Sequence, residues 1–105
     1  MAALPSPIKQ VIQDYVTKIS SQIPVEKVIL FGSYAKGTFD SDSDIDIAIF
    51  SNHFRKMDEI EGFRFLFTQA MDYDADLQPL AFTMEDYENP MGSVEEILKT
   101  GIEIS

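Results

Sequence analysis

The sequence predicts an α+β fold, a mixed α/β arrangement in which a small mixed sheet is flanked by helices. The expected order is helix, strand, strand, helix, strand, helix. The loop between the first two strands is too short for a helical crossover, which favours antiparallel pairing between them. A hydrophobic share of 45% over 105 residues is typical of a globular chain with one core. We therefore expect residues 1–105 to form a single domain.

Composition narrows the possible partners. Lys and Arg number 8 against 18 Asp and Glu, a net charge of −10. Because binding to duplex nucleic acid needs clustered cations, we expect no such partner. The chain has no Cys, which excludes disulfides and thiolate zinc sites. No signal-peptide pattern and no apolar run of membrane length occur, so we expect a soluble cytoplasmic protein without membrane contact.

The first helix is predicted to follow a frayed lead-in, Met1–Pro5. Ser6 has the character of an N-cap, Pro7 suits the first helical position, and Pro24 ends the helix. Helical spacing of apolar residues predicts one buried stripe. Its members are Ile8, Val11, Ile12, Tyr15, Val16 and Ile19.

The next segments are predicted to be a strand, a short turn and a second strand. Val25–Phe31 has a continuous apolar centre, as in a strand covered on both faces. Tyr34–Gly37 is predicted to form one helical turn and Thr38–Ser43 a loop. The second strand is expected over Asp44–Phe50, followed by a polar connection that contains His53 as a loop residue.

A second helix is predicted from Asp58 to about Met71, after the Ser51–Met57 connection. Phe65 falls on the side of this helix away from Phe63. Two interpretations of Phe65 stay open: burial under the preceding loop or the last helix, or anchoring of an interface with a partner or a second copy. The stripe expected on the other side consists of Ile60, Phe63, Phe67 and Ala70.

The remaining elements are a strand and a short C-terminal helix. Asp76–Phe82 is predicted as a strand, and Pro79 within it indicates an edge or an irregular end. Glu85–Asn89 is expected to be a turn or short helix. Ser93, with Glu three residues later, predicts a capping box that opens a helix to Thr100, and Gly101 ends it.

Asp44 and Asp46 are the main candidates for a functional site. At i and i+2 on a strand their side chains share one face, and two like charges raise each other's pKa unless a cation lies between them. The adjacent Gly32-Ser33 turn suggests a phosphate site beside a metal site. Asp40 and Asp42 are interpreted as part of a solvated turn.

Two other motifs come close to this stretch and fail. A P-loop requires its lysine after the second glycine, whereas Lys36 precedes Gly37. A calcium loop starting at Asp40 would need glycine where Ile45 stands and glutamate where Ser51 stands. Neither nucleotide binding of the P-loop type nor an EF-hand is therefore expected.

The order of these motifs resembles the polymerase-beta-type nucleotidyltransferase superfamily. Gly32-Ser33 after a strand, a short helix and then Asp44-Ile45-Asp46 on the next strand match its signature. Asp76, at the entry to a later apolar run, is taken as the third carboxylate in preference to Asp72 and Asp74. The small size resembles the minimal nucleotidyltransferases (MNT), which are antitoxins of HEPN/MNT toxin–antitoxin modules.

The resemblance implies a reaction and a set of roles. A hydroxyl attacks the α-phosphorus of a nucleoside triphosphate, with Mg²⁺ held by Asp44, Asp46 and Asp76. Asp76 is also expected to take the hydroxyl proton. Gly32 is expected to let the backbone approach the triphosphate and Ser33 to bind it. Lys36 either neutralises phosphate charge or is a solvated surface lysine.

Two functions of different classes follow. The first is a Mg²⁺-dependent nucleotidyltransferase that transfers AMP from ATP to a hydroxyl on a HEPN-domain partner. The second is a non-catalytic antitoxin or structural subunit that acts by protein binding. Larger members of the superfamily carry a second domain that shapes the acceptor site. The resemblance therefore implies that the acceptor surface comes from another chain or a homo-oligomer.

Overall fold

A computed structural model describes residues 4–104. The predicted frayed lead-in falls largely on residues 1–3, outside this range, while Leu4 packs against the core. No helix in the described range is long and apolar enough to cross a membrane. In chain order the elements are α1 (Ser6–Ser20), β1 (Lys27–Phe31), α2 (Ser33–Lys36), β2 (Ile45–Phe50), the 3₁₀ helix η1 (Asn52–Lys56), α3 (Glu59–Ala70), β3 (Leu77–Phe82), α4 (Met84–Glu88), α5 (Ser93–Thr100) and β4 (Ile102–Glu103).

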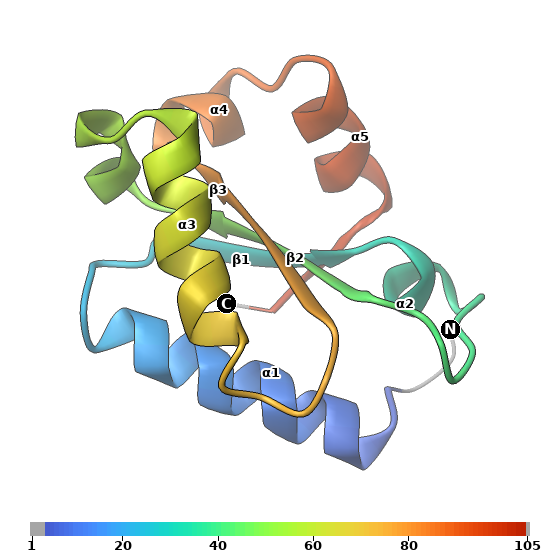
Figure 1. Ribbon diagram of the computed structural model, residues 1–105. Helices are drawn as coiled ribbons and strands as arrows, with labels where there is room; N and C mark the ends of the chain where they lie inside the picture. Colours follow the sequence, from blue (N-terminus) through green and yellow to red (C-terminus); the bar gives the residue numbers. More distant parts are fainter. Residues whose placement is uncertain (1–3, 105) are drawn as a thin grey trace.

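The strands form one mixed sheet in the order β3-β2-β1-β4 (Figure 1). β1 pairs antiparallel with β2 and with β4, whereas β2 and β3 are parallel. The α+β prediction and the antiparallel first pair are confirmed. β4 was not predicted, because two residues are too few to show strand periodicity and only their pairing with Ile29 and Leu30 defines them.

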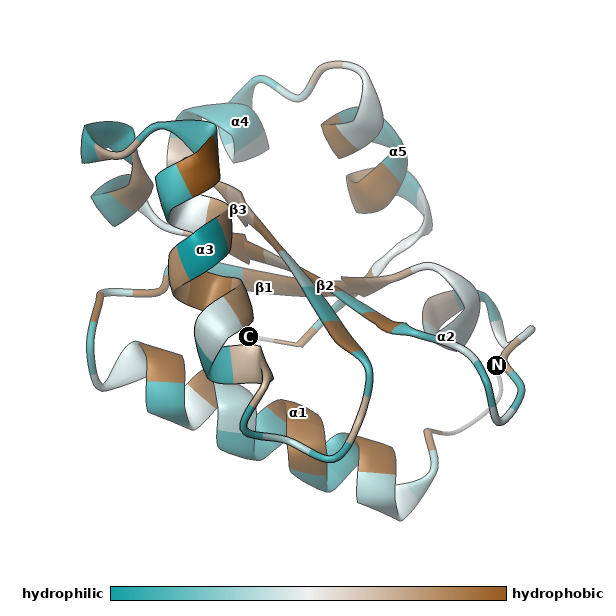
Figure 2. Ribbon diagram, in the orientation of Figure 1, coloured by the Kyte–Doolittle hydropathy of each residue, from teal (hydrophilic) through white to brown (hydrophobic). Residues whose placement is uncertain are grey.

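The main core lies between one face of the sheet and helices α1 and α3 (Figure 1). β1 and β2 are hydrophobic along most of their length, as expected for interior strands covered on both faces (Figure 2). Tyr15 of α1 is fully buried, and its hydroxyl donates a hydrogen bond to the Leu66 carbonyl of α3 at 2.8 Å. This bond joins the two helices across the core.

The opposite face of the sheet is covered over only part of its length. Ile29, Ala48 and Phe50 pack against Val94 and Ile97 of α5. Tyr87 of α4 adds an edge-to-face contact with Phe50, with 5.4 Å between ring centroids. Asp46 continues the same face of β2 toward the start of the strand. Asp46 lies outside this apolar cluster, so α4 and α5 do not cover the half of the face around it.

Several helix ends differ from the prediction. Ser6 and Ser93 are the first residues of their helices and cap nothing with their side chains. A capping box forms instead on α4: Asp86 accepts from the Thr83 N–H at 2.9 Å, and Thr83 Oγ1 accepts from the Asp86 N–H at 3.3 Å. α1 ends at Ser20, four residues before Pro24, and the side chains of Ser21 and Gln22 donate hydrogen bonds to the Lys18 carbonyl in its last turn.

The predicted buried stripe of α3 is wrong for three of its four residues. Ile60 is 66% exposed and Phe63 42%, and Phe67 is only partly buried. The helix instead buries Gly62, Leu66 and Ala70, while Phe65 packs against the main core. Gly62 faces β3, where an added Cβ would lie 3.1 Å from the Ala81 Cβ, so the absence of a side chain lets the helix approach closely.

β3 is an edge strand, as Pro79 predicted. The Ile45 N–H bonds the Asp76 carbonyl, and the Ser51 N–H bonds the Phe82 carbonyl. By alternation along the strand, the backbone N–H and C=O groups of even-numbered residues point toward β2. The backbone nitrogen of Pro79 therefore points to the open edge. Proline therefore costs no ladder hydrogen bond there.

Tyr15→Phe should lower the free energy of unfolding by about 1 kcal/mol, because it removes the buried hydrogen bond between α1 and α3 while keeping the ring. Urea unfolding followed by circular dichroism measures this. Tyr73→Phe is the matched control, since the Tyr73 ring packs edge-on against Tyr15 but is only partly buried. Equal stability of Tyr15→Phe and the parent would show that the bond contributes nothing.

Candidate active site

The candidate site lies on the uncovered half of the sheet, where β2 and β3 begin. In the parallel register Ile45 pairs with Leu77 and Asp46 with Gln78. The Ile45 N–H bonds the Asp76 carbonyl at 2.8 Å, which continues the ladder one step and sets Asp44 beside Asp76. Because paired residues of parallel strands point to the same face, all three predicted carboxylates belong to one face and one end of the sheet.

Asp46 is the carboxylate most strongly affected by the fold. It is partly buried on an interior strand, and this burial raises its pKa, with a further increase from the negative charge of Asp44. An ionised pair in this position destabilises the fold unless a cation compensates it. Hard carboxylate oxygens are the ligands that Mg²⁺ prefers, so the pair suits a magnesium ion.

The third carboxylate is less closely associated with this pair. Asp44 and Asp76 are exposed at the strand entrances. Within residues 4–104 no three His, Asp or Glu side chains are grouped closely enough to hold a metal ion. The arrangement is therefore a coupled pair with Asp76 adjoining it, and convergence of all three carboxylates on one cation stays a prediction.

The neighbouring aspartates are in different environments. Asp72 forms an ion pair with Lys18 of α1, so its charge is already matched. Asp74 lines the same polar cavity as Asp76, a space of about 420 Å³ that Tyr34, Ser43 and Tyr73 also border. Asp72 is thus oriented toward Lys18, while Asp74 lies close to the position assigned to Asp76.

Gly32 is required by the site itself. Its backbone has φ 74° and ψ −153°, a conformation that side chains other than glycine rarely adopt. A Cβ built on it would also lie 2.2 Å from Asp46 Oδ2. The expected reason for this glycine was space for a triphosphate. The structure gives another: the space is taken by the carboxylate of Asp46, a residue that pairs with Phe31 in the β1–β2 register.

Ser33 and Lys36 lie at the two ends of α2. Ser33 is partly buried and follows Gly32 directly, whereas Lys36 is exposed in the last turn. Gly37 then closes the helix in the left-handed conformation, with φ 76°. Ser33 therefore directly follows the residue that lies against the Asp46 carboxylate, and Lys36 has the exposure of a surface lysine.

The loop before β2 is built by Asp40. Its carboxylate accepts from the Asp42 N–H at 2.9 Å, and its own N–H donates to Ser43 Oγ at 2.9 Å. Stacking of Phe39 on Tyr34, with centroids 4.6 Å apart, attaches the loop to α2. The interpretation of Asp40 and Asp42 as turn residues agrees with this geometry.

Gln78 is a further residue of the site that the sequence does not predict. It is partly buried on β3, pairs with Asp46 in the register, and lines a cavity with Asp76. Its amide therefore belongs to the same face as the three carboxylates. Nothing in the sequence indicates this, because the position of Gln78 follows from the parallel register between β2 and β3. That pairing joins segments distant in the chain, and only the fold defines it.

Known proteins share this fold and part of this sequence. A solved structure described as a putative nucleotidyltransferase from Sulfolobus solfataricus superposes with a TM-score of 0.69 at 18% identity, covering 98% of this chain and 89% of that one. It shares the fold. A protein of Methanocaldococcus jannaschii named "putative protein adenylyltransferase" is 28% identical over 78 residues, which is 71% of this chain and 79% of that protein.

The match to a family covers most of the chain. Residues 10–101 match the nucleotidyltransferase domain, a span that includes β1, the Gly32-Ser33 turn, both aspartates of β2, and β3. The site described above therefore lies wholly inside the matched region. The chain belongs to the nucleotidyltransferase domain family.

Proposed function

We propose that this protein transfers a nucleoside monophosphate, AMP from ATP, to a hydroxyl group in a Mg²⁺-dependent reaction. The observation that carries the proposal is the Asp44–Asp46 pair on the open half of the sheet, with the Asp46 carboxylate beside Gly32. A strand that holds two like charges, one of them partly buried, is expected when those charges bind a cation. The family supports nucleotidyl transfer as the reaction.

Each residue has a role that follows from its position. Asp44 and Asp46 would hold magnesium, which supplies charge neutralisation and activation of the attacking oxygen. Ser33, next to Gly32, offers its hydroxyl to the phosphate groups. Asp76 lies beside Asp44 with its side chain exposed, where it can accept the proton of an incoming hydroxyl.

A protein is the proposed acceptor, and a HEPN-domain toxin is the proposed partner. The name of the M. jannaschii relative supports transfer to a protein. The partner assignment rests on the resemblance of this small chain to the antitoxins of HEPN/MNT modules, which would act in the cytoplasm where ATP and Mg²⁺ are available. A gene for a HEPN-domain protein beside the gene for this chain would support it directly.

Asp46→Asn should abolish AMP transfer, because it removes the charge that binds the cation at nearly constant shape. Incubation of the chain and its candidate partner with radiolabelled ATP and Mg²⁺ measures the transfer. Asp42→Asn is the matched control, an exposed aspartate in the preceding turn, and should retain full activity. Transfer at the parental rate by Asp46→Asn would favour the non-catalytic antitoxin over the enzyme.

The same substitution should stabilise the metal-free protein at neutral pH. The pKa of Asp46 is higher in the folded than in the unfolded chain, so protonation of Asp46 stabilises the fold. This stabilisation is complete below the unfolded pKa, about 3.9, and is lost as the pH rises through the folded pKa. Thermal unfolding of both proteins between about pH 3 and 7 should show a difference that grows with pH. Added Mg²⁺ should stabilise the parent and leave Asp46→Asn unchanged. A constant difference across this range would contradict the assignment.

Ser33→Ala should weaken binding of ATP with Mg²⁺ by about three- to tenfold, the value of one hydrogen bond, without loss of stability. Gly32→Ala should lose binding and stability together, since it strains the backbone and displaces Asp46. Isothermal titration with a non-hydrolysable ATP analogue and urea unfolding separate the two effects. Unchanged affinity in Ser33→Ala would exclude its hydroxyl from the phosphate site.

A further inference from the structure

An apolar strip runs along the exposed side of α3. Ile60 is 66% exposed, Phe63 42% and Met71 68%. Phe67 is partly buried and stacks on Phe63, with 5.2 Å between ring centroids. Large apolar side chains that gather on one exposed surface mark interaction sites more often than isolated ones do.

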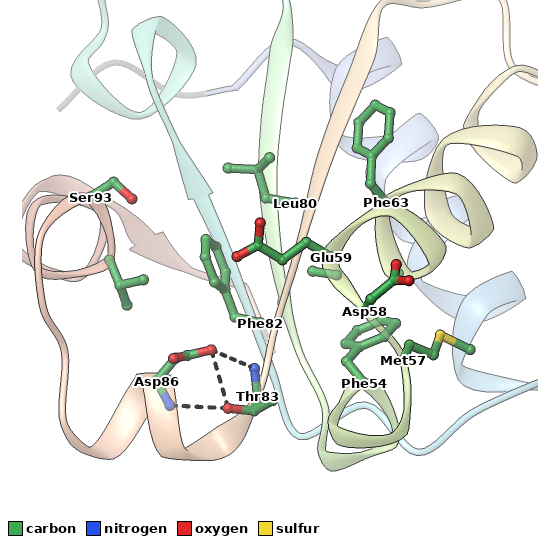
Figure 3. A pocket seen from close by; sticks show the side chains of 13 residues that line it. Phe54, Met57, Asp58, Glu59, Phe63, Leu80, Phe82, Thr83, Asp86 and Ser93 are labelled. Atoms are coloured by element: carbon green, nitrogen blue, oxygen red, sulfur yellow. Dashed lines mark hydrogen bonds between the residues drawn. The ribbon is translucent and has the colours of Figure 1, made fainter.

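One end of this strip opens into a groove beside β3. The groove has a volume of about 520 Å³, and Phe63 of α3 lines it together with Leu80 and Phe82 of β3 (Figure 3). Its charged lining residues are Asp58, Glu59 and Asp86, and among the described residues no Lys or Arg lines it. Asp58 and Asp86 are held in place because each caps a helix. The groove is therefore apolar with an acidic border.

The other end of the strip reaches the candidate active site. Phe67 and Met71 line a second cavity, about 270 Å³, whose other members include Gln78 and Asp76. Together Ile60, Phe63, Phe67, Met71 and Leu80 form what we call the α3–β3 surface. It extends from the acidic groove to the carboxylate expected to accept the hydroxyl proton.

The edge of β3 is poorly suited to another mode of association. Pro79 directs its nitrogen to the open edge and cannot donate a hydrogen bond to an added strand. Recognition at this surface then depends on side chains, as when a helix lays its apolar face in a groove.

We propose that the α3–β3 surface docks the acceptor protein, through a helix whose apolar face is flanked by Lys and Arg, and that docking brings an acceptor hydroxyl to Asp76. The charge of the surface selects this occupant. A second copy of this chain would bring another net charge of −10 and another acidic border against the first, whereas a basic helix would complement it. The proposal rests on the proposed function for the step that follows docking.

In the transfer step the acceptor hydroxyl reacts with the nucleoside triphosphate. The acceptor oxygen forms a bond to the α-phosphorus of the nucleoside triphosphate, and the bond from that phosphorus to the bridging oxygen breaks. Pyrophosphate leaves with the bridging oxygen and its electron pair. The hydroxyl proton passes to the Asp76 carboxylate.

A synthetic peptide tests the docking. The probe is an amphipathic helix with a leucine face, flanking Lys and Arg, and one Tyr; a second peptide carries Glu in place of every Lys and Arg. Titration of the isotope-labelled chain should shift the NMR signals of Phe63, Phe67 and Met71 with the basic peptide and not with the acidic one. With ATP and Mg²⁺, mass spectrometry should detect AMP on the Tyr of the basic peptide.

Matched variants assign the binding to this surface. Phe63→Ser combined with Ile60→Ser should weaken binding of the basic peptide by about tenfold or more, as expected for loss of two exposed anchor residues away from the carboxylates. Met91→Ser should bind like the parent, because Met91 is 80% exposed but lies between α4 and α5, outside the surface. Both variants should bind the ATP analogue with parental affinity.

Several results would overturn the proposal. They are equal binding of the two peptides, shifts that map elsewhere, equal peptide affinity in the double variant and the parent, or peptide binding without AMP transfer by a chain shown to adenylylate another protein. Sedimentation that shows a dimer broken by the double variant would assign the surface to a second copy. Failure of the parent chain to bind ATP would instead contradict the proposed function. Peptide docking without ATP binding would show that the proposed function fails while the docking surface stands.

Discussion

The contact between Asp46 and Gly32 is the constraint on which the site depends. β1 and β2 pair antiparallel with Phe31 opposite Asp46, so the residue after Phe31 meets the Asp46 carboxylate. Only a residue without a Cβ fits there, and the same residue turns the chain through a positive φ into α2. One glycine thus makes room for the partly buried Asp46 carboxylate and places Ser33 at the start of α2. Burial in this arrangement raises the pKa of Asp46, and the neighbouring charge of Asp44 raises it further.

The second consequence is a division of one sheet face into two halves. Side chains alternate along β2, so Asp46, Ala48 and Phe50 share a face. α4 and α5 cover the face at Phe50, where its residues are apolar, and leave it open at Asp46. The covered half secures the strand by burial of apolar surface, which lets the open half carry charges that a fully buried strand would not tolerate.

The acidic composition and the exposed apolar residues of α3 have a common interpretation. A net charge of −10 disfavours self-association and nucleic acid, yet the α3–β3 surface exposes several large apolar side chains. Apolar residues with an acidic border fit a basic protein surface. Because this surface ends at Asp76, partner binding and catalysis would share one edge of the sheet.

Sequence by itself determined the fold class, the antiparallel β1–β2 pair, the edge position of β3 and the candidate residues Gly32, Ser33, Asp44 and Asp46. Each follows from a local pattern: short loops, proline, alternation and motif order. Tertiary structure alone decided the buried side of α3, because both sides are apolar and the small Gly62 selects the one that approaches β3. It also decided that Gln78 pairs with Asp46, that Ile102 and Glu103 form β4, and that Gly32 makes room for the Asp46 carboxylate. Those features depend on pairing and contact between segments distant in the chain, and local periodicity carries no information about which distant segment becomes the neighbour.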